Sequence, residues 1–341
     1  RLVVVNCFTN KKGMGTEIMP KASIRDVAQL ASVSPTTVSL ILNNKGDRFP
    51  QETIDRVIAA RDELGYIPNK NAQGLRGTQK TMIGILVPSL RNPFFADLMQ
   101  SIQAQGGRDV DLIFQSAADD MVEESITALV ERGVNGLIIA RPIPHAEKVI
   151  QFVKRRGVVA VMLDQSEDLG LTDIVTTDES QGGRLVAELL ARQGHQKVAL
   201  VRPSLLTHNM TQRIRGFMQN WPYELVTFET TLSKHGGLAV AEKVNQAAVS
   251  AVFAVNDELA IGVLRGLADL GVRVPQDISV VGYDNTDYAE FVIPSLTTVT
   301  QPVWQLGQKA LDLVLHRLED PQADLVTEMM AVKLVEREST K

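Results

Sequence analysis

Apolar and polar positions follow two different patterns on either side of residue 80. Before that point, apolar residues recur at helical spacing within short segments; after it, short runs of β-branched residues alternate with amphipathic stretches. Strands alternating with helices predict an α/β fold with a doubly wound parallel sheet and right-handed crossovers. The nine predicted strands are 82–87, 111–114, 136–140, 158–163, 173–177, 197–201, 224–228, 251–255 and 278–282.

Residues 23–42 predict two short helices joined by a tight turn. Ser23 can cap the first helix, and Asp26 three residues later completes a capping-box pattern. Ser34 can cap the second helix, with Pro35 at its first position, where a missing N–H costs nothing. The first helix has one apolar face, formed by Ile24, Val27, Ala28 and Ala31.

The second helix is polar at its N-terminal end. Val38 and either Ile41 or Leu42 face inward. The positions left outside are Pro35, Thr36, Thr37, Ser39 and Leu40. This is the layout of a helix-turn-helix, whose second helix presents its N-terminal side chains to base edges. On pattern alone, a small helical hairpin with no role in DNA binding remains open.

Residues 50–64 predict a third helix that closes a three-helix core, and Gly65 ends it at the C′ position. Its predicted inward stripe is Ile54, Val57, Ile58 and either Arg61 or Leu64. After it, residues 66–69 are interpreted as an extended link and residues 71–76 as a single weak helical turn.

Specific words in the sequence carry a family resemblance. These are the short segments DVA, VS-P-TTVS, ELGYIPN and NAQGLR between residues 24 and 76, and LVERES near the end. In these segments the chain resembles the LacI/GalR family of transcription regulators. The resemblance implies a helix-turn-helix DNA-binding headpiece at 19–66, a linker with a hinge helix at 67–80, and an effector-binding and dimerisation core at 81–341. Residues 1–18 are interpreted as a non-native or disordered leader.

By the same resemblance, Leu75 wedges into the minor groove and kinks the duplex where two hinge helices pair. The main base-reading positions of the family are occupied by Pro35, Thr36 and Leu40. None of these carries an amide or guanidinium group, which can form two hydrogen bonds with the edge of an adenine or guanine base. We therefore expect readout through Thr contacts, methyl packing and DNA shape. The expected DNA-binding residues are Ser34, Pro35, Thr36, Thr37, Ser39, Leu40, Asn43, Asn69, Ala72 and Leu75.

The remainder resembles the two-lobed type I periplasmic binding proteins, especially the ribose-binding type. Lobe 1 is expected at about 81–177 and 302–330, and lobe 2 at about 178–301 and 331–341. Ligands of such sheets sit beyond the carboxyl ends of the strands, where polar residues recur in this chain. The resemblance implies that the effector-binding residues are Asn92, Phe94, Phe95, Asp164, Asp178, Arg213, Asn256, Asp284 and Gln301.

This set suits a sugar. Sugar hydroxyls both donate and accept, so carboxylates, amides and an arginine can bond them in pairs, and a phenylalanine ring can stack on the C–H face. One phenylalanine of the pair is expected to belong to the lobe core. Two departures weaken the match to ribose: Gln165 stands where ribose binders carry Arg, and Leu232 stands nearest to an expected aromatic.

Composition narrows the class of protein. The chain is 44% hydrophobic and 22% charged, as expected of a soluble globular protein of two or three domains. Its net charge of −5 is uneven: residues 21–80 hold nine Lys/Arg against six Asp/Glu, a basic region that fits binding to phosphates. Cys7 is the single cysteine, which excludes an internal disulfide and fits a reducing cytoplasm.

The sequence bears on three alternative functions. Enzyme activity is not expected, because the five histidines are scattered and no nucleophile elbow or phosphate-binding glycine loop occurs in the required context. A sugar-transport binding protein would explain the core but not the headpiece. A regulator sensing a purine or a sugar phosphate, as inducer or corepressor, is the closest rival; Arg91 or Arg141 could assist Arg213 in holding a phosphate.

The expectation is a cytoplasmic, homodimeric repressor of a carbohydrate-utilisation operon. It binds double-stranded operator DNA and is released by a small sugar effector; no cofactor, metal or membrane is involved. The identity of the effector, the sign of its action, the operator sequence and a tetrameric assembly stay open.

Overall fold

The computed structural model divides the chain into two compact units, Arg1–Gln79 and Lys80–Lys341, called here the headpiece unit and the core. No helix among the described residues is both long and apolar enough to cross a membrane. The residues that the structure describes are 22–42, 46, 48–66, 80–107, 109–163 and 170–341.

The headpiece unit contains the three predicted helices, α1 (Ile24–Leu30), α2 (Pro35–Leu42) and α3 (Gln51–Glu63). The predicted capping box of α1 is confirmed: the Ser23 backbone N–H donates to the Asp26 carboxylate at 2.7 Å, and the Asp26 N–H donates to the Ser23 hydroxyl at 3.4 Å. Ser34 caps α2, accepting the Thr37 N–H at 3.0 Å. These caps satisfy N–H groups that would otherwise lack partners.

The three helices close one small core, and one sequence prediction about it was wrong. Ile58, expected to face inward, is 37% exposed, and Ala60 is buried beside Val57 instead. The stripe runs through Val57, Ala60 and Leu64, so Ile58 lies one helical step (about 100°) away from Val57. The buried residues are Val27, Ala28, Ala31, Val38, Ile41, Val57 and Ala60.

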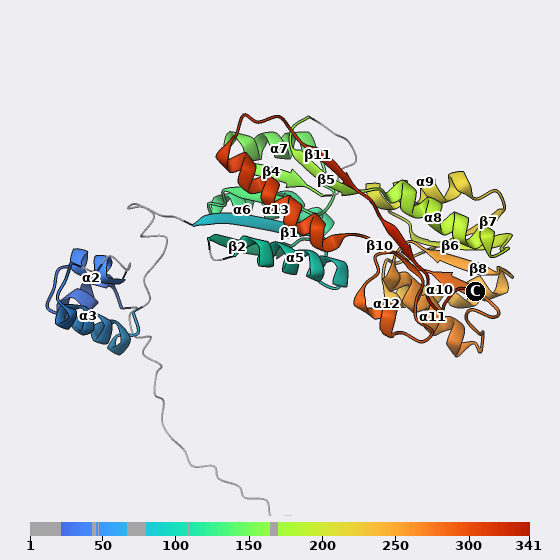
Figure 1. Cartoon of the computed structure of the whole chain (residues 1–341), viewed down its shortest axis with the longest axis horizontal. Coiled ribbons are helices and arrows are strands. Elements are labelled where there is room, and N and C mark those ends of the chain that lie inside the picture. Colours follow the sequence, from blue (N-terminus) through green and yellow to red (C-terminus); the bar gives the residue numbers. More distant parts are fainter. Residues whose placement is uncertain (1–21, 43–45, 47, 67–79, 108, 164–169) are drawn as a thin grey trace, which may run out of the picture. The chain divides into compact units, whose positions relative to one another are not determined.

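The core has two lobes, each a parallel sheet with helices on both faces (Figure 1). In lobe 1, helices α5 (Pro93–Gly106) and α13 (Val303–Glu319) cover one face, and α6 (Val122–Glu131) and α7 (Ala146–Arg155) cover the other, with a short 3₁₀ turn (Asp119–Met121) before α6. The sheet order is β11–β5–β4–β3–β1–β2. Its strands are β1 (Thr81–Val87), β2 (Val110–Ser116), β3 (Gly136–Ile139), β4 (Val159–Met162), β5 (Asp173–Thr177) and β11 (Thr327–Met330).

Lobe 2 repeats this plan with the sheet order β7–β6–β8–β9. The helix pair α8 (Glu179–Arg192) and α9 (His208–Asn220) lies on one face, and α10 (Lys234–Gln246) and α11 (Asp257–Asp269) lie on the other (Figure 1). The short α12 (Asp287–Phe291) follows β9. The strands are β6 (Lys197–Pro203), β7 (Glu224–Thr230), β8 (Ala251–Ala254) and β9 (Ser279–Val281).

Helices α8 and α9 approach each other closely at two glycines. A Cβ atom on Gly183 would overlap the backbone oxygen of Arg213, and one on Gly216 would overlap the backbone oxygen of Ser180. Only glycine fits at these two contacts, since any larger residue would force the helices apart. The spacing of α8 and α9 is therefore fixed by backbone contact.

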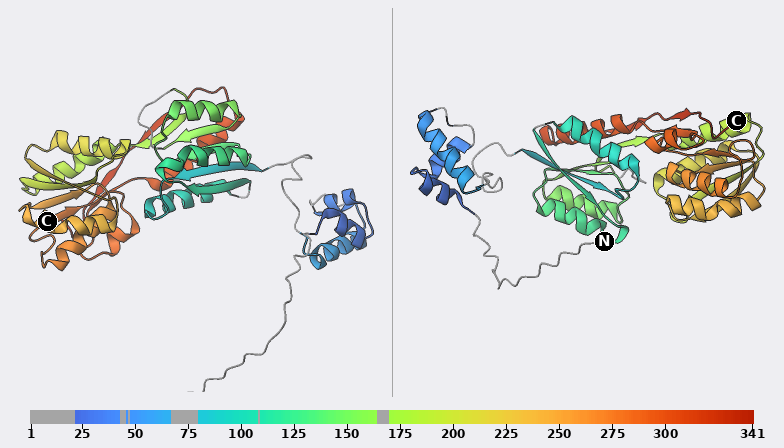
Figure 2. Two further views of the ribbon diagram at one scale, coloured as in Figure 1. Left: turned by 180° about the vertical axis from the view of Figure 1, so that it is seen from behind. Right: turned by 90° about the horizontal axis from the view of Figure 1, so that it is seen from below.

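All nine predicted strands are present, and the structure adds three more: β10 (Thr298–Thr300), β11 and β12 (Lys333–Val335). β10 and β12 pair antiparallel and form a two-stranded ribbon of their own. The chain passes between the lobes three times, from β5 to α8, from β10 to α13 and from β11 to β12, so both lobes contain segments from distant parts of the sequence (Figure 2).

Candidate functional site

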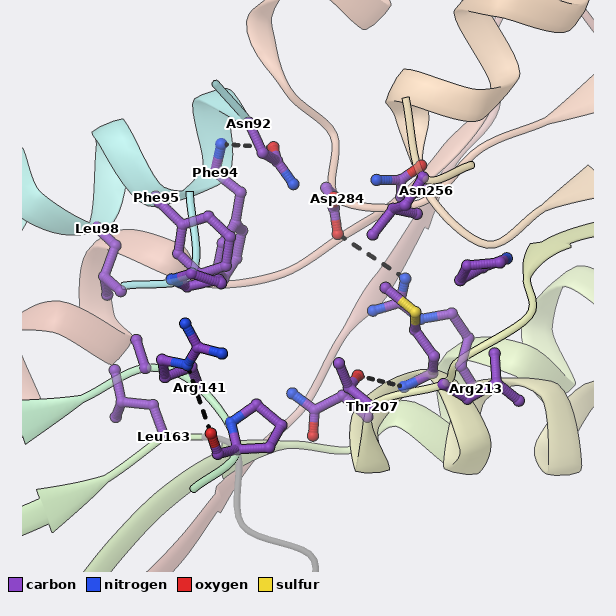
Figure 3. A pocket seen from close by; sticks show the side chains of 18 of the residues that line it. Asn92, Phe94, Phe95, Leu98, Arg141, Leu163, Thr207, Arg213, Asn256 and Asp284 are labelled. Atoms are coloured by element: carbon purple, nitrogen blue, oxygen red, sulfur yellow. Dashed lines mark hydrogen bonds and ion pairs between the residues drawn. The ribbon is translucent and has the colours of Figure 1, made fainter. Parts of the chain in front are cut away.

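A cavity of about 580 Å³ lies between the two lobes of the core (Figure 3). This volume is within the range of small-molecule sites. Its walls come from residues just beyond the carboxyl ends of strands in both sheets, the place where open α/β sheets bind ligands. Seven of the nine predicted effector residues line it: Asn92, Phe94, Phe95, Arg213, Asn256, Asp284 and Gln301.

Part of the wall from lobe 1 is formed by the start of α5. Asn92 caps this helix, its amide oxygen accepting the Phe94 N–H at 3.0 Å, and Pro93 occupies the first helical position. Phe94 and Phe95 meet edge to face with their ring centroids 5.2 Å apart. Both rings are half-buried, and each lines the cavity and packs against the lobe core, so neither belongs to the core alone.

Arg213 is the central cation of the lobe 2 wall and is almost fully buried. Its Nε donates to Glu179 at 2.9 Å, its Nη1 donates to the Val255 carbonyl, and its guanidinium carbon lies 3.3 Å from the centroid of the Tyr283 ring. Burial is the largest single influence and opposes the charge, but Glu179, Tyr283 and Asp284 together outweigh it, so the pKa of Arg213 is raised above its ordinary value. The guanidinium is thus held charged and in one orientation.

Asp284 lies beside this arginine, its carboxylate 3.9 Å from Arg213 Nη1, and accepts a hydrogen bond from Gln301 Nε2 at 2.8 Å. Its φ of +109° is strained for a residue with a Cβ, and such strain concentrates at functional sites. Burial raises the pKa of Asp284 to about 7; the carboxylates of Asp257 and Glu179 add to the rise, whereas Arg213 and Asn92 oppose it.

Two further wall residues combine helix capping with a position on the cavity. Asn256 caps α11 through its amide oxygen, which accepts the Leu259 N–H at 3.0 Å, and its Nδ2 group carries two further donors. Thr207, which the sequence reasoning missed, caps α9 by accepting the Met210 N–H at 3.3 Å and also lines the cavity. A strand followed by a capped helix therefore delivers polar groups to this site.

One predicted effector residue is not on the wall of the described cavity. Asp178 does not line the cavity; it caps α8, its carboxylate accepting the Gln181 N–H at 2.8 Å. Its neighbour Thr177, the last residue of β5, lines the cavity instead, because successive residues of a strand point to opposite sides. Asp164 and Gln165 lie outside the described residues.

Sequence reasoning used Arg141 only as a possible phosphate contact, but the structure makes it part of the wall. This buried arginine donates to the Asp119 carboxylate and to the backbone oxygens of Ala117 and Pro142. The sequence contained a signal for Arg141, because this residue directly follows the predicted strand 136–140. The other wall residues were selected by the same criterion, a polar residue just after a strand. Leu232, the nearest match to an expected aromatic, also lines the cavity.

On the candidate DNA-binding surface, Ser34, Pro35 and Thr36 are exposed at the start of α2. The remaining described residues of this set are half-buried: Thr37, Ser39 and Leu40. Four expected DNA-binding residues lie outside the described part of the chain: Asn43, Asn69, Ala72 and Leu75.

Two family models match the chain. Residues 23–69 match bacterial regulatory proteins of the lacI family, and residues 187–340 match the periplasmic binding protein-like domain. Among solved structures, a LacI family transcriptional regulator from Enterococcus faecium with bound ribose is 35% identical, with a TM-score of 0.72, over 76% of this chain and 98% of that one. A lac repressor dimer bound to operator and the anti-inducer ONPF is 29% identical, with a TM-score of 0.78, over 94% and 99%.

Relatives of known function match along nearly the whole length. The ribose operon repressor of Escherichia coli (strain K12) is 30% identical over 93% of this chain and 99% of its own length. The HTH-type transcriptional repressor PurR of Vibrio vulnificus (strain CMCP6) is 31% identical over 94% of this chain and 99% of its own length. With this much of the sequence shared, the chain belongs to the LacI family of DNA-binding transcriptional regulators.

Proposed function

We propose that this chain is a cytoplasmic, homodimeric repressor whose interlobe cavity binds a neutral sugar, and that the bound sugar releases the protein from its operator. The observation that carries the sugar assignment is the charge balance of the cavity wall. Its charged side chains among the described residues are two arginines and two aspartates: Arg141, Arg213, Asp119 and Asp284.

Each arginine already has a carboxylate partner. Arg141 pairs with Asp119, and Arg213 pairs with Glu179 and lies near Asp284. A phosphate ester entering this cavity would meet carboxylates beside every guanidinium on the described wall, whereas a neutral hydroxyl can donate to a carboxylate and accept from an amide. The balance of charge therefore supports a neutral polyhydroxyl ligand over a sugar phosphate.

The apolar part of the wall supports the same class. Phe94 and Phe95 offer ring surface opposite the polar groups of lobe 2, and Leu163 and Leu232 add aliphatic surface (Figure 3). A sugar presents hydroxyls at its edge and C–H groups on its faces, which matches a cavity with polar and apolar walls. The bound ribose in the Enterococcus faecium regulator is consistent with this assignment.

Dimerisation is supported by an exposed apolar patch on lobe 2, called here the α12 patch: Tyr288, Phe291 and Ile293. Ile293 is 94% exposed and Phe291 is 78% exposed, which is unfavourable for a monomer in water. Pairing with a second copy would bury this patch. Two headpieces would then reach successive half-sites of a pseudo-palindromic operator.

A thermal-shift screen tests the ligand class. Purified protein is heated with neutral pentoses and hexoses, each paired with its phosphate ester, and with purines. A ligand at about 100 times its dissociation constant stabilises the folded state by about 2.7 kcal/mol, which is a clear rise in melting temperature. Stabilisation by one neutral sugar is expected. Stabilisation by phosphate esters or purines alone would replace the proposal with the rival effector class.

A further inference from the structure

Glu179 is a buried carboxylate that does not line the cavity but contacts residues that do. It is the first residue of α8, and its side chain is 2% exposed. Its Oε2 accepts from Arg213 Nε at 2.9 Å, and its Oε1 accepts from the Thr177 hydroxyl at 2.8 Å. Both of these partners lie on the cavity wall.

These contacts belong to a closed ring of five side chains. Thr177 Oγ also lies 3.1 Å from Gln301 Oε1, Gln301 Nε2 donates to Asp284, and Asp284 lies 3.9 Å from the Arg213 guanidinium. Thr177 and Gln301 stand where the chain passes between the lobes. The ring therefore joins two interlobe crossings to the two central charges of the site.

The Glu179–Arg213 pair is not needed to hold the two helices together. Contact at Gly183 and Gly216 already fixes the spacing of α8 and α9, as described above. A buried ion pair also contributes little net stability, because removing both charges from water costs about as much as their attraction returns. What the pair does accomplish is to orient and neutralise the one cation on the lobe 2 wall of the described cavity.

We propose that Glu179 is a positioning and specificity-determining residue: it fixes the Arg213 guanidinium and cancels its charge, so that the cavity accepts a neutral hydroxyl beside Arg213 and rejects an anionic group there. This inference rests on the proposed sugar-binding function. An anion approaching Arg213 meets two carboxylates around a single guanidinium, those of Glu179 and Asp284. Removing the charge of Glu179 alone restores a balance of one cation to one carboxylate.

The test compares wild type with Glu179→Gln, which keeps the size of the side chain and removes its charge. Binding is measured by isothermal titration calorimetry with pairs such as D-ribose and D-ribose 5-phosphate or D-glucose and D-glucose 6-phosphate, using the pair whose neutral member stabilises wild type most. Wild type is expected to prefer the neutral sugar. In the variant, the ratio of the two dissociation constants should shift at least tenfold toward the phosphate ester.

A pH profile separates this role from a merely structural one. Because Glu179 contributes to the raised pKa of Asp284, the midpoint of pH-dependent sugar binding should move to lower pH in Glu179→Gln. Glu188→Gln is the matched control, since Glu188 lies on the same helix and pairs only with exposed Arg184 in the described structure. This control should keep both the wild-type preference and the wild-type midpoint.

Glu179→Asp is a second variant, to be used if Glu179→Gln does not fold. It keeps the charge but withdraws the carboxylate from Arg213, so neutral-sugar affinity should fall at least threefold while the preference over the phosphate ester remains. Equal changes for both ligands in Glu179→Gln, or unchanged binding in Glu179→Asp, would overturn the inference. If wild type bound no neutral sugar, the proposed function would fail first, and the inference would fail with it.

Discussion

At the residue scale, Asp284 combines a strained backbone with a buried carboxyl whose pKa is raised to about 7. A sugar hydroxyl that donates to the ionised carboxylate makes a charge-assisted hydrogen bond, and this bond weakens when protonation leaves a neutral carboxyl group. Sugar affinity should therefore fall as the pH drops through about 7 and level off at lower pH. Calorimetry between pH 5.5 and 8 measures this. A flat profile in wild type would show that Asp284 does not bind the sugar as an anion.

The same carboxyl has a linked effect on folding. Its pKa in the folded protein is above its ordinary value of 3.8, so the unfolded chain binds fewer protons between these two values. The contribution of Asp284 to the free energy of unfolding of the ligand-free core should therefore decrease as the pH rises from about 4 toward 7. Asp284→Asn should remove this contribution, which urea unfolding at several pH values can measure against wild type.

Sequence reasoning found much of the site at this scale, because one rule covers most of it. Asn92, Asn256 and Asp284 each follow a strand, and the carboxyl ends of parallel strands meet at one edge of a sheet. The same rule also selected Asp178, which caps α8 and is not on the wall of the described cavity. Glu179 could not be found this way, since its role depends on the distance between α8 and α9, which no local pattern states.

At the element scale, one buried ion pair fixes α13 against the sheet of lobe 1. Asp173 at the start of β5 accepts from Arg317 Nε at 3.0 Å and Nη2 at 2.8 Å, and also from the Val326 N–H at 2.9 Å. Asp173→Asn leaves the largely buried Arg317 without its counter-charge and should destabilise the core by about 3–5 kcal/mol. Urea unfolding checks this; exposed Asp312→Asn on α13 is the control and should stay within about 0.5 kcal/mol of wild type.

The strands that sequence reasoning missed share a physical property. β10, β11 and β12 are only three or four residues long, and β11 (Thr-Glu-Met-Met) is an edge strand without a continuous buried run. Each lies at a crossing between lobes, where long-range pairing rather than local hydrophobicity creates the strand. The other nine strands lie in longer or more apolar runs, so the local sequence pattern was sufficient to predict them.

At the scale of the whole molecule, the α12 patch should hold the dimer together. Ile293→Asp combined with Phe291→Asp places two charges in the proposed interface, so sedimentation velocity should show a monomer at concentrations where wild type is a dimer. Met218→Asp is the matched control, because Met218 lies on α9 of the same lobe and is 56% exposed. A double variant that stays dimeric would move the interface elsewhere.

The response of DNA binding to sugar decides whether the chain is a sugar-released repressor. Full-length protein first selects its preferred duplex from a random-sequence library, and fluorescence anisotropy then measures binding to that duplex with and without the sugar identified by thermal shift. We expect saturating sugar to raise the dissociation constant for DNA at least tenfold, because a ligand that favours the released state must weaken DNA binding. An unchanged or tighter DNA affinity at saturating sugar would contradict a sugar-released repressor.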